Sequence, residues 1–119
     1  IVAHFKKGKK KIELGNTDVY RDFSSVKFVV EAYASLLKSN VTSEIINICS
    51  GHSYSLQQVV NTLEKLAGYK IEIFVNPDFV RADEVKKIMG DNSKLLSIIP
   101  DLQVTKLSEI LKVMYLNGQ

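Results

Sequence analysis

The sequence predicts a mixed α/β (α+β) fold in a single domain that spans residues 1–119. Short β-branched segments alternate along the chain with longer segments whose apolar residues recur at helical spacing. With 45% hydrophobic and 24% charged residues, the composition is typical of a globular domain. The sequence shows no internal repeat and no low-complexity linker, so it gives no sign of a domain boundary.

The first elements are short. Residues 1–8 predict the end of a helix, because Gly8 is a suitable stop and lysines favour a helix C-terminus. Lys11–Leu14 predicts a strand, and a turn over residues 15–18 leads to an extended segment, Val19–Phe23. Because no N-cap precedes Ile1, we expect the chain to be a piece of a longer protein.

The middle of the chain predicts a helix and then a buried strand. Ser24 or Ser25 can cap the helix, whose apolar residues form one face before a stop near Asn40. The segment Glu44–Cys49 is short and rich in β-branched residues, which favours a buried strand ending at Ser50.

A capping box, formed by Ser55 and Gln58, starts the clearest helix of the chain, and Gly68 ends it. Alternation over Ile71–Val75 predicts a strand, which Asn76-Pro77-Asp78 interrupts.

Residues 80–90 are irregular and polar, and a short helix is expected from Asp91 until just before Pro100. Thr105 is expected to cap a last helix, whose predicted buried residues are Leu107, Ile110, Leu111 and Met114. Strands as short as these cannot build a complete doubly wound sheet, so we expect some of them to complete a larger sheet formed outside the chain.

Charge and cysteine content exclude several classes of protein. The net charge of +3 suits an anionic ligand but is smaller than a typical nucleic-acid footprint. Five lysines lie between Lys6 and Lys11 without interleaved aromatic residues, which favours a solvated helix end over a nucleic-acid or membrane surface. The single cysteine, Cys49, cannot form an internal disulfide, and its apolar surroundings predict an unreactive thiol. Together with the lack of a signal-peptide pattern, this predicts a cytoplasmic location.

The familiar catalytic and cofactor motifs do not occur in the sequence. It contains no glycine-rich phosphate loop, no Tyr-x-x-x-Lys pair, no nucleophile elbow and no Cys/His cluster with metal-site spacing. We therefore predict no catalytic, cofactor-binding or metal-binding residue within residues 1–119, and expect the chain alone to be catalytically inert.

Two arginines are the candidates for binding. Arg21 lies where an extended segment turns toward a helix, so its guanidinium could clamp a phosphate, or could simply pair with Asp22 or another carboxylate. Arg81 precedes Asp83 and Glu84, which could serve a ribosyl diphosphate or form a solvated loop of mixed charge. From residues alone, the ion pair and the solvated loop are the simpler interpretations, and a stand-alone phosphate- or nucleic-acid-binding regulatory module remains an alternative.

Three segments together resemble a known family. IELGNTDVYRDFSSVKFVVEAY, INICSGHSYSLQQVV and VRADEVKKIMGDNSKL are similar, in order and spacing, to the C-terminal half of NAD(P)-dependent sugar-nucleotide epimerases and dehydratases. These belong to the extended short-chain dehydrogenase/reductase (SDR) family, and the resemblance is closest to its GDP-mannose 4,6-dehydratase and GDP-4-dehydro-6-deoxy-mannose reductase branch. It covers nearly the whole chain.

The resemblance implies a substrate-binding C-terminal subdomain, separated from the Rossmann portion that carries NAD(P) and the catalytic residues. It assigns Arg21 and Arg81 to the nucleotide diphosphate, Glu84 to ribose hydroxyls, and Asn16 to a position beside the nucleotide. It also implies that the partners are a nucleotide-diphosphate sugar, the Rossmann domain of the same protein, and further copies in a homo-oligomer.

The sequence departs from the family pattern at three positions. Ser25 and Phe28 replace aspartates of the helix-entry motif, and Ala82 replaces a proline that would stiffen the loop presenting Arg81. These changes bear on the identity of the sugar nucleotide more than on the fold.

Overall fold

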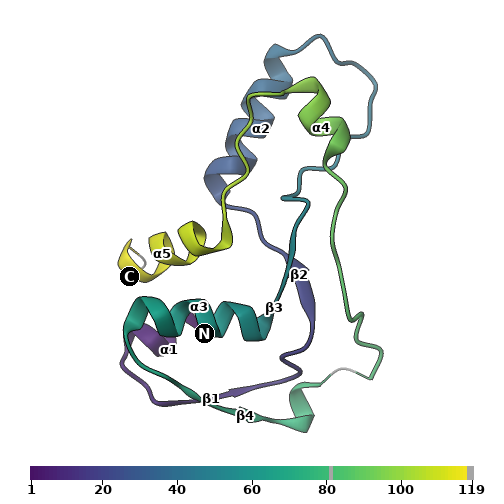
Figure 1. Cartoon of the computed structure of the whole chain (residues 1–119). Helices are drawn as coiled ribbons and strands as arrows, with labels where there is room; N and C mark the ends of the chain where they lie inside the picture. The colour runs from purple at the N-terminus through teal and green to yellow at the C-terminus, as the bar shows by residue number, and fades with distance from the viewer. Residues whose placement is uncertain (81, 118–119) are drawn as a thin grey trace.

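The computed structural model describes residues 1–80 and 82–117. The molecule is elongated, with extents of 50 × 34 × 19 Å, and divides into a lower and an upper part (Figure 1). In chain order its elements are α1 (Val2–Lys6), β1 (Lys11–Leu14), β2 (Tyr20–Asp22), α2 (Val26–Lys38), β3 (Ser53–Ser55), α3 (Leu56–Ala67), β4 (Glu72–Val75), the 3-10 turn η1 (Pro77–Phe79), α4 (Ser93–Ile98) and α5 (Leu107–Asn117).

The strands form two separate pairs. β1 runs parallel to β4 with Ile12 opposite Ile73, and β2 runs antiparallel to β3 with Arg21 opposite Tyr54. A parallel bridge between Tyr20 and Lys87 places the segment around residue 87 along the other edge of β2. As a result β2, which carries Arg21, lies between β3 and a segment more than sixty residues away in the sequence.

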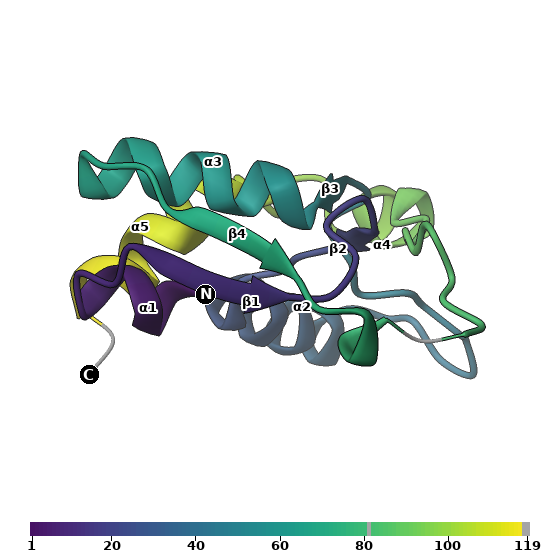
Figure 2. The same cartoon turned by 90° about the horizontal axis from the view of Figure 1, so that it is seen from below.

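The lower part is built around α3. Ser55 Oγ accepts from the Gln58 N–H while the Gln58 side chain accepts from the Ser55 N–H, and Gly68 ends the helix at φ +76°. The apolar face of α3 packs with α1, α5 and the β1–β4 pair, which lie beside it in both views (Figure 2). This first core cluster comprises Phe5, Ile12, Val59, Val60, Leu63, Ile71, Leu107 and Leu111.

The upper part is a smaller core between α2 and α4. Ser25 Oγ accepts from the Phe28 N–H at 3.1 Å and so caps α2. Phe28, Ala32, Leu95 and Leu102 form this second core cluster, and the outer face of α2 remains exposed. The two parts are therefore joined mainly by β2, β3 and the connecting segments (Figure 1).

Most predicted elements are confirmed. The strands at Lys11–Leu14, Val19–Phe23 and Ile71–Val75, the capping box, and the short helix before Pro100 all occur where the pattern placed them. The helix that Ser25 caps ends at Lys38, where Ser39 Oγ donates to the Leu36 carbonyl, slightly before the predicted stop at Asn40.

The predicted strand at Glu44–Cys49 is wrong. No strand of the described residues pairs with this segment, which is irregular. Ile46 and Ile48 pack against the second core cluster, whereas Ile45 is 90% exposed. A β-branched run therefore buries part of its apolar surface here without the hydrogen-bonded neighbour that a strand requires.

Two predictions about the last helix are also wrong. The carbonyl of Lys106 accepts from the Ile110 N–H at 3.1 Å, so α5 begins one residue later than a Thr105 cap would place it. The Thr105 hydroxyl instead pairs with Ser25 Oγ at 2.9 Å, which ties the start of α5 to the start of α2. Met114, predicted to be buried, is 48% exposed because the described elements leave that side of α5 open.

Among residues 1–80 and 82–117, no helix is both long enough and apolar enough to cross a membrane.

Candidate functional site

The site is assembled on β2 by two backbone hydrogen bonds. The Tyr20 N–H donates to the Lys86 carbonyl at 2.7 Å, and the Ile88 N–H donates to the Tyr20 carbonyl at 3.0 Å. These bonds dock the segment after residue 82 against β2 as an added strand-like edge. Residues 84 and 85 are thereby placed beside Arg21, although they follow it by more than sixty positions.

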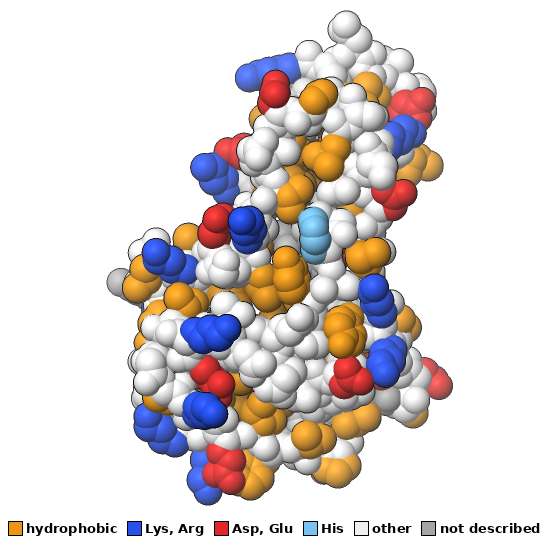
Figure 3. Space-filling view, viewed as in Figure 1, with side chains coloured by type: hydrophobic (Ala, Val, Ile, Leu, Met, Phe, Trp, Pro, Cys, Tyr) orange, Lys and Arg blue, Asp and Glu red, His pale blue; other side chains and the backbone are white. Residues whose placement is uncertain are grey.

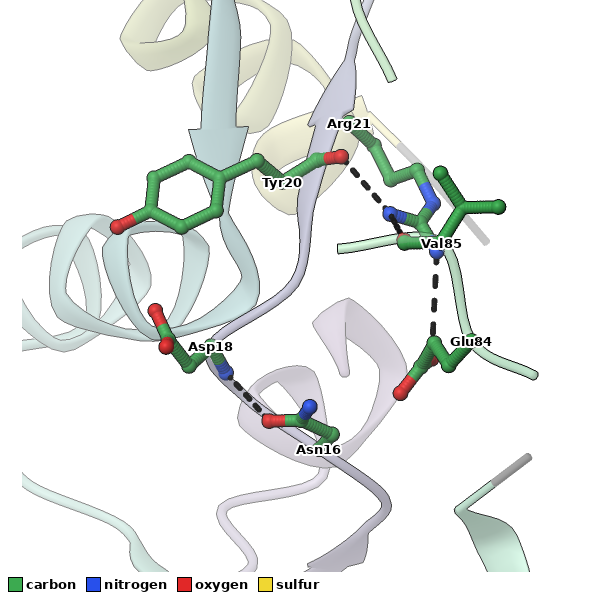
Figure 4. A network of polar contacts seen from close by, with 6 residues as sticks. All are labelled: Asn16, Asp18, Tyr20, Arg21, Glu84 and Val85. Carbon is green, nitrogen blue, oxygen red and sulfur yellow. Dashed lines mark hydrogen bonds and ion pairs between the residues drawn. The ribbon is translucent and has the colours of Figure 1, made fainter. Parts of the chain in front are cut away.

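Arg21 reaches across to this segment. Its Nη1 donates to the carbonyls of Tyr20 at 2.8 Å and Val85 at 2.9 Å, and its Nη2 lies 3.9 Å from Glu84 Oε1 (Figure 4). The Arg21 side chain is 30% exposed and that of Glu84 is 19% exposed. The structure therefore brings together two of the residues that the sequence singled out, and Arg21 keeps donors that no described residue uses.

Glu84 places one of its two carboxylate oxygens in the interior. Its Oε2 is buried and has no hydrogen-bond partner among the described residues. A buried carboxylate oxygen without a donor is costly, and native structures usually satisfy such atoms with a partner. The atom is suited to accept a hydrogen bond from a hydroxyl or amide group that enters the site.

Asn16 lies in the turn before β2. Its Oδ1 accepts from the Asp18 N–H at 2.9 Å, an Asx turn that fixes the side chain, and Figure 4 shows it apart from the Arg21–Glu84 pair. Asp18 forms an ion pair with Lys86 at 3.1 Å, so this turn is also tied to the segment that carries Glu84.

The fourth predicted site residue, Arg81, lies outside the described residues. Its convergence with Arg21 on one diphosphate stays a prediction.

Asp22 is an organising residue that the sequence interpretation did not identify as such. Its Oδ1 accepts from the Ser50 N–H at 2.9 Å and its Oδ2 from the Gly51 N–H at 3.1 Å. Asp22 thus does not pair with Arg21, as the simpler interpretation allowed. The signal available in the sequence was the Ser50-Gly51 turn, whose glycine adopts φ +74° and leaves adjacent N–H groups for an anionic acceptor.

The same turn is held from its other side. Asn92 Nδ2 donates to the Cys49 carbonyl at 3.2 Å. A Cβ atom at Gly90 would collide with Cys49 Sγ, which explains why a glycine occupies the position. Burial raises the pKa of the Cys49 thiol, and the negative charge of Asp22 raises it further, so the thiol is protonated at neutral pH and is a weak nucleophile.

The side chains of the site are suited to binding a ligand. It provides guanidinium donors and a carboxylate acceptor that no residue of 1–80 or 82–117 uses, and these suit phosphate oxygens and sugar hydroxyls. Within residues 1–80 and 82–117, no group of three or more His, Cys, Asp and Glu side chains could hold a metal ion. The pKa of Asp91 is lowered by its hydrogen bonds from the Ser93 hydroxyl and N–H, at the start of α4.

Fold and site together define the class of protein as the extended SDR sugar-nucleotide epimerases and dehydratases, of which the chain resembles the C-terminal part. The chain belongs to the GDP-mannose 4,6 dehydratase family, whose model matches residues 1–114.

Curated relatives agree with this assignment. A GDP-6-deoxy-D-talose 4-dehydrogenase from Aggregatibacter actinomycetemcomitans is 39% identical over 118 residues, covering 98% of this chain and 40% of the relative. A GDP-6-deoxy-D-mannose reductase from Pseudomonas aeruginosa is 30% identical over 96 residues, covering 79% of this chain and 32% of the relative. The chain thus spans well under half the length of the enzymes that it matches.

Two solved structures also match most of this chain and less than half of their own length. The crystal structure of a candidate epimerase from Burkholderia cenocepacia J2315 superposes with a TM-score of 0.92 at 42% identity, covering 96% of this chain and 38% of that one. RMD from Pseudomonas aeruginosa, complexed with NADPH, gives a TM-score of 0.83 at 25% identity with the same coverage.

Proposed function

We propose that this chain is the nucleotide-sugar-binding segment of an NAD(P)-dependent epimerase, dehydratase or reductase, and that its ligand is of the GDP-mannose type. The observation that carries the proposal is the meeting of Arg21 with Glu84, whose Oε2 is buried without a partner among the described residues. Two relatives that are named for GDP sugars support guanine as the base of the ligand.

In this proposal Arg21 binds the diphosphate. Its contact with Glu84 Oε1 is 3.9 Å, longer than a hydrogen bond, so Nη2 is available to a phosphate oxygen while Nη1 stays fixed to two carbonyls. Such anchoring reduces the conformational entropy that the side chain loses when a ligand binds. Binding energy at the diphosphate is remote from the reacting sugar carbon and orients that carbon for the chemistry.

Glu84 is proposed to accept a hydrogen bond from a ribose hydroxyl through Oε2, which would satisfy the buried oxygen. Asn16 borders the nucleotide from the turn before β2, and Arg81 supplies a second guanidinium to the diphosphate. These assignments follow the family pattern residue by residue.

NAD(P) and the catalytic residues are proposed to belong to the Rossmann portion of the same enzyme, so that residues 1–119 alone are catalytically inert. The NADPH complex of RMD supports the choice of cofactor for the whole enzyme. Titration of the chain with NAD and NADP tests whether the cofactor site lies outside residues 1–119. A micromolar complex of the chain with either cofactor would contradict this proposal.

Replacing Arg21 is expected to weaken the binding of GDP-mannose. Removal of one charge-assisted contact to phosphate in Arg21→Ala should raise the Kd for GDP-mannose about tenfold or more, measured by calorimetric titration. Lys27→Ala is the matched control, because it also removes one positive charge, from an exposed site on α2, and should leave the Kd unchanged.

Two further titrations complete this test. Glu84→Gln should weaken the binding of GDP-mannose without weakening that of inorganic diphosphate, because only GDP-mannose carries ribose hydroxyls and the lost carboxylate lies beside Arg21. If a random oligonucleotide binds instead, with a steep salt dependence that Arg21→Ala does not alter, the chain is a nucleic-acid-binding module and the proposal fails.

The isolated chain is expected to self-associate. The outer face of α2 exposes Val26, Val30, Tyr33 and Leu37 by 80%, 58%, 60% and 87%, at spacings that place them on one side of the helix. In the whole enzyme we propose that the Rossmann portion covers this face. Sedimentation velocity should show concentration-dependent oligomers that Val30→Lys reduces, whereas a monomer at the highest attainable concentration would contradict the expectation.

A further inference from the structure

We propose that the chain has a second binding site, which takes a phosphorylated sugar, in a hollow bounded by β3, α3 and the start of α5. The hollow has a volume of about 590 Å³, within the range of ligand pockets. It lies where the lower part of the molecule meets the upper part, and Figure 3 shows a histidine at that waist, with a basic side chain and an acidic side chain next to each other nearby.

One wall is a single face of α3. Gln58, Asn61, Thr62 and Lys65 line the hollow, and their spacing of three and four residues aligns them along the helix. The opposite wall is the segment Val104–Ser108, held in place by the hydrogen bond between Thr105 and Ser25. The hollow is thus formed by elements that are far apart in the sequence.

The charge of the lining selects an anion. Lys65 and Lys106 line the hollow together with His52, and no Asp or Glu does. Neither lysine forms an ion pair with any described residue. The neighbouring acid Glu64 accepts from the Ile71 N–H at 3.0 Å, so it is directed to the end of the helix instead. Two lysines without an ion-pair partner among the described residues line one hollow, and their positive charge favours a phosphate group there.

A hydrogen bond orients His52, which lines the hollow. The Ser50 carbonyl lies 3.0 Å from His52 Nδ1, and because a carbonyl only accepts, Nδ1 is the donor of this bond. Ser50, only 2% exposed, is itself held by Asp22 through its N–H. This chain of bonds orients the ring and leaves Nε2 to form a hydrogen bond with a sugar hydroxyl.

The remaining lining suits hydroxyl groups. Asn61 Oδ1 accepts from Gln57 at 2.9 Å, which leaves its amide hydrogens free within the described structure. The Ser108 hydroxyl adds a donor and an acceptor, and the Gln58 amide nitrogen adds donors, because its Oε1 accepts from the Ser55 N–H. The Thr62 hydroxyl donates to the Gln58 carbonyl at 2.8 Å, so it offers an acceptor to the hollow. A phosphate alone would fill only a small part of this volume, whereas a hexose phosphate uses both the lysines and the neutral polar groups.

The hollow is distinct from the proposed nucleotide-sugar site, because neither Arg21, Glu84 nor Asn16 lines it. The two proposals therefore fail or succeed separately.

Titration of the whole chain with glucose 6-phosphate, followed by amide chemical shifts, tests the inference. We expect saturable shifts at Thr62 and Ser108, with weaker binding of glucose and of inorganic phosphate. Lys65→Gln should raise the Kd about tenfold. Lys70→Gln is the matched control, since it removes the same charge from an exposed residue just beyond α3 that does not line the hollow. Arg21→Ala should leave this Kd unchanged.

Three outcomes would overturn the inference. The first is the absence of saturable shifts at Thr62 and Ser108. The second is equal weakening by Lys65→Gln and Lys70→Gln, which would indicate attraction to net charge alone. The third is binding of inorganic phosphate as tight as that of glucose 6-phosphate, because the neutral polar lining would then have no role.

Discussion

Replacing Leu63 by alanine is expected to lower the free energy of unfolding by about 2–5 kcal/mol, the largest effect of any single truncation considered. Leu63 is 0% exposed and lies in the first core cluster, on the face of α3 that packs against α1, α5 and the β1–β4 pair. The cost combines the lost burial of the side chain with the cavity that remains. Because domains of this size are stable by only about 5–15 kcal/mol, urea denaturation followed by circular dichroism should show a clearly lower midpoint.

Leu37→Ala is the control for this prediction. The chemical change is the same, but Leu37 is 87% exposed near the end of α2, so its truncation should change the unfolding free energy by less than about 0.5 kcal/mol. Measurements at low protein concentration keep self-association out of the comparison. Equal losses in the two variants would mean that the first core cluster does not hold the chain together.

Short sequence patterns correctly predicted α3, β1 and β4. The capping box of Ser55 and Gln58 and the left-handed Gly68 define α3 within a few residues of chain, and both occur as expected. The sequence likewise predicted β1 at Lys11–Leu14 and, from alternation, β4 at Ile71–Val75, although it could not indicate that the two strands pair in parallel.

Features that depend on distant partners were not predicted correctly. Glu44–Cys49 has the composition of a buried strand, yet composition does not supply a neighbouring strand, and the segment packs irregularly on the second core cluster. Thr105 is a good capping residue by type, but its hydroxyl pairs with Ser25, eighty positions earlier. In both cases a tertiary contact outweighs the local preference.

In the candidate site, too, the sequence predicted some residues but not their contacts with distant segments. Arg21 and Glu84 were identified from motifs, and the structure brings them together, whereas the anchoring of Arg21 by the Val85 carbonyl was invisible in the sequence. The sequence suggests Asp22 only as an ion-pair partner for Arg21, the residue beside it. Side chains that alternate along a strand point to opposite faces, so adjacent residues of β2 contact different segments.

Asp22→Asn is expected to lower the free energy of unfolding by about 2–3 kcal/mol. The carboxylate accepts one N–H on each oxygen, from Ser50 at 2.9 Å and Gly51 at 3.1 Å. An amide has a single acceptor, so its NH₂ group would face one of these backbone donors and leave it without a partner. Ser50 is 2% exposed, and water cannot readily replace the lost acceptor there. Thermal denaturation measures the loss, and amide hydrogen exchange at Ser50 and Gly51 should locate it.

Asp18→Asn provides the comparison, because Asp18 also carries a carboxylate next to β2 but uses it in an ion pair with Lys86 whose two side chains are 63% and 73% exposed. Surface pairs of this kind contribute about 0–1 kcal/mol, so Asp18→Asn should be nearly neutral. If Asp22→Asn were equally neutral, with unchanged exchange at Ser50 and Gly51, the two hydrogen bonds would not fix the turn. The position of His52 would then need another cause, since the Ser50 carbonyl that orients its ring belongs to this same turn.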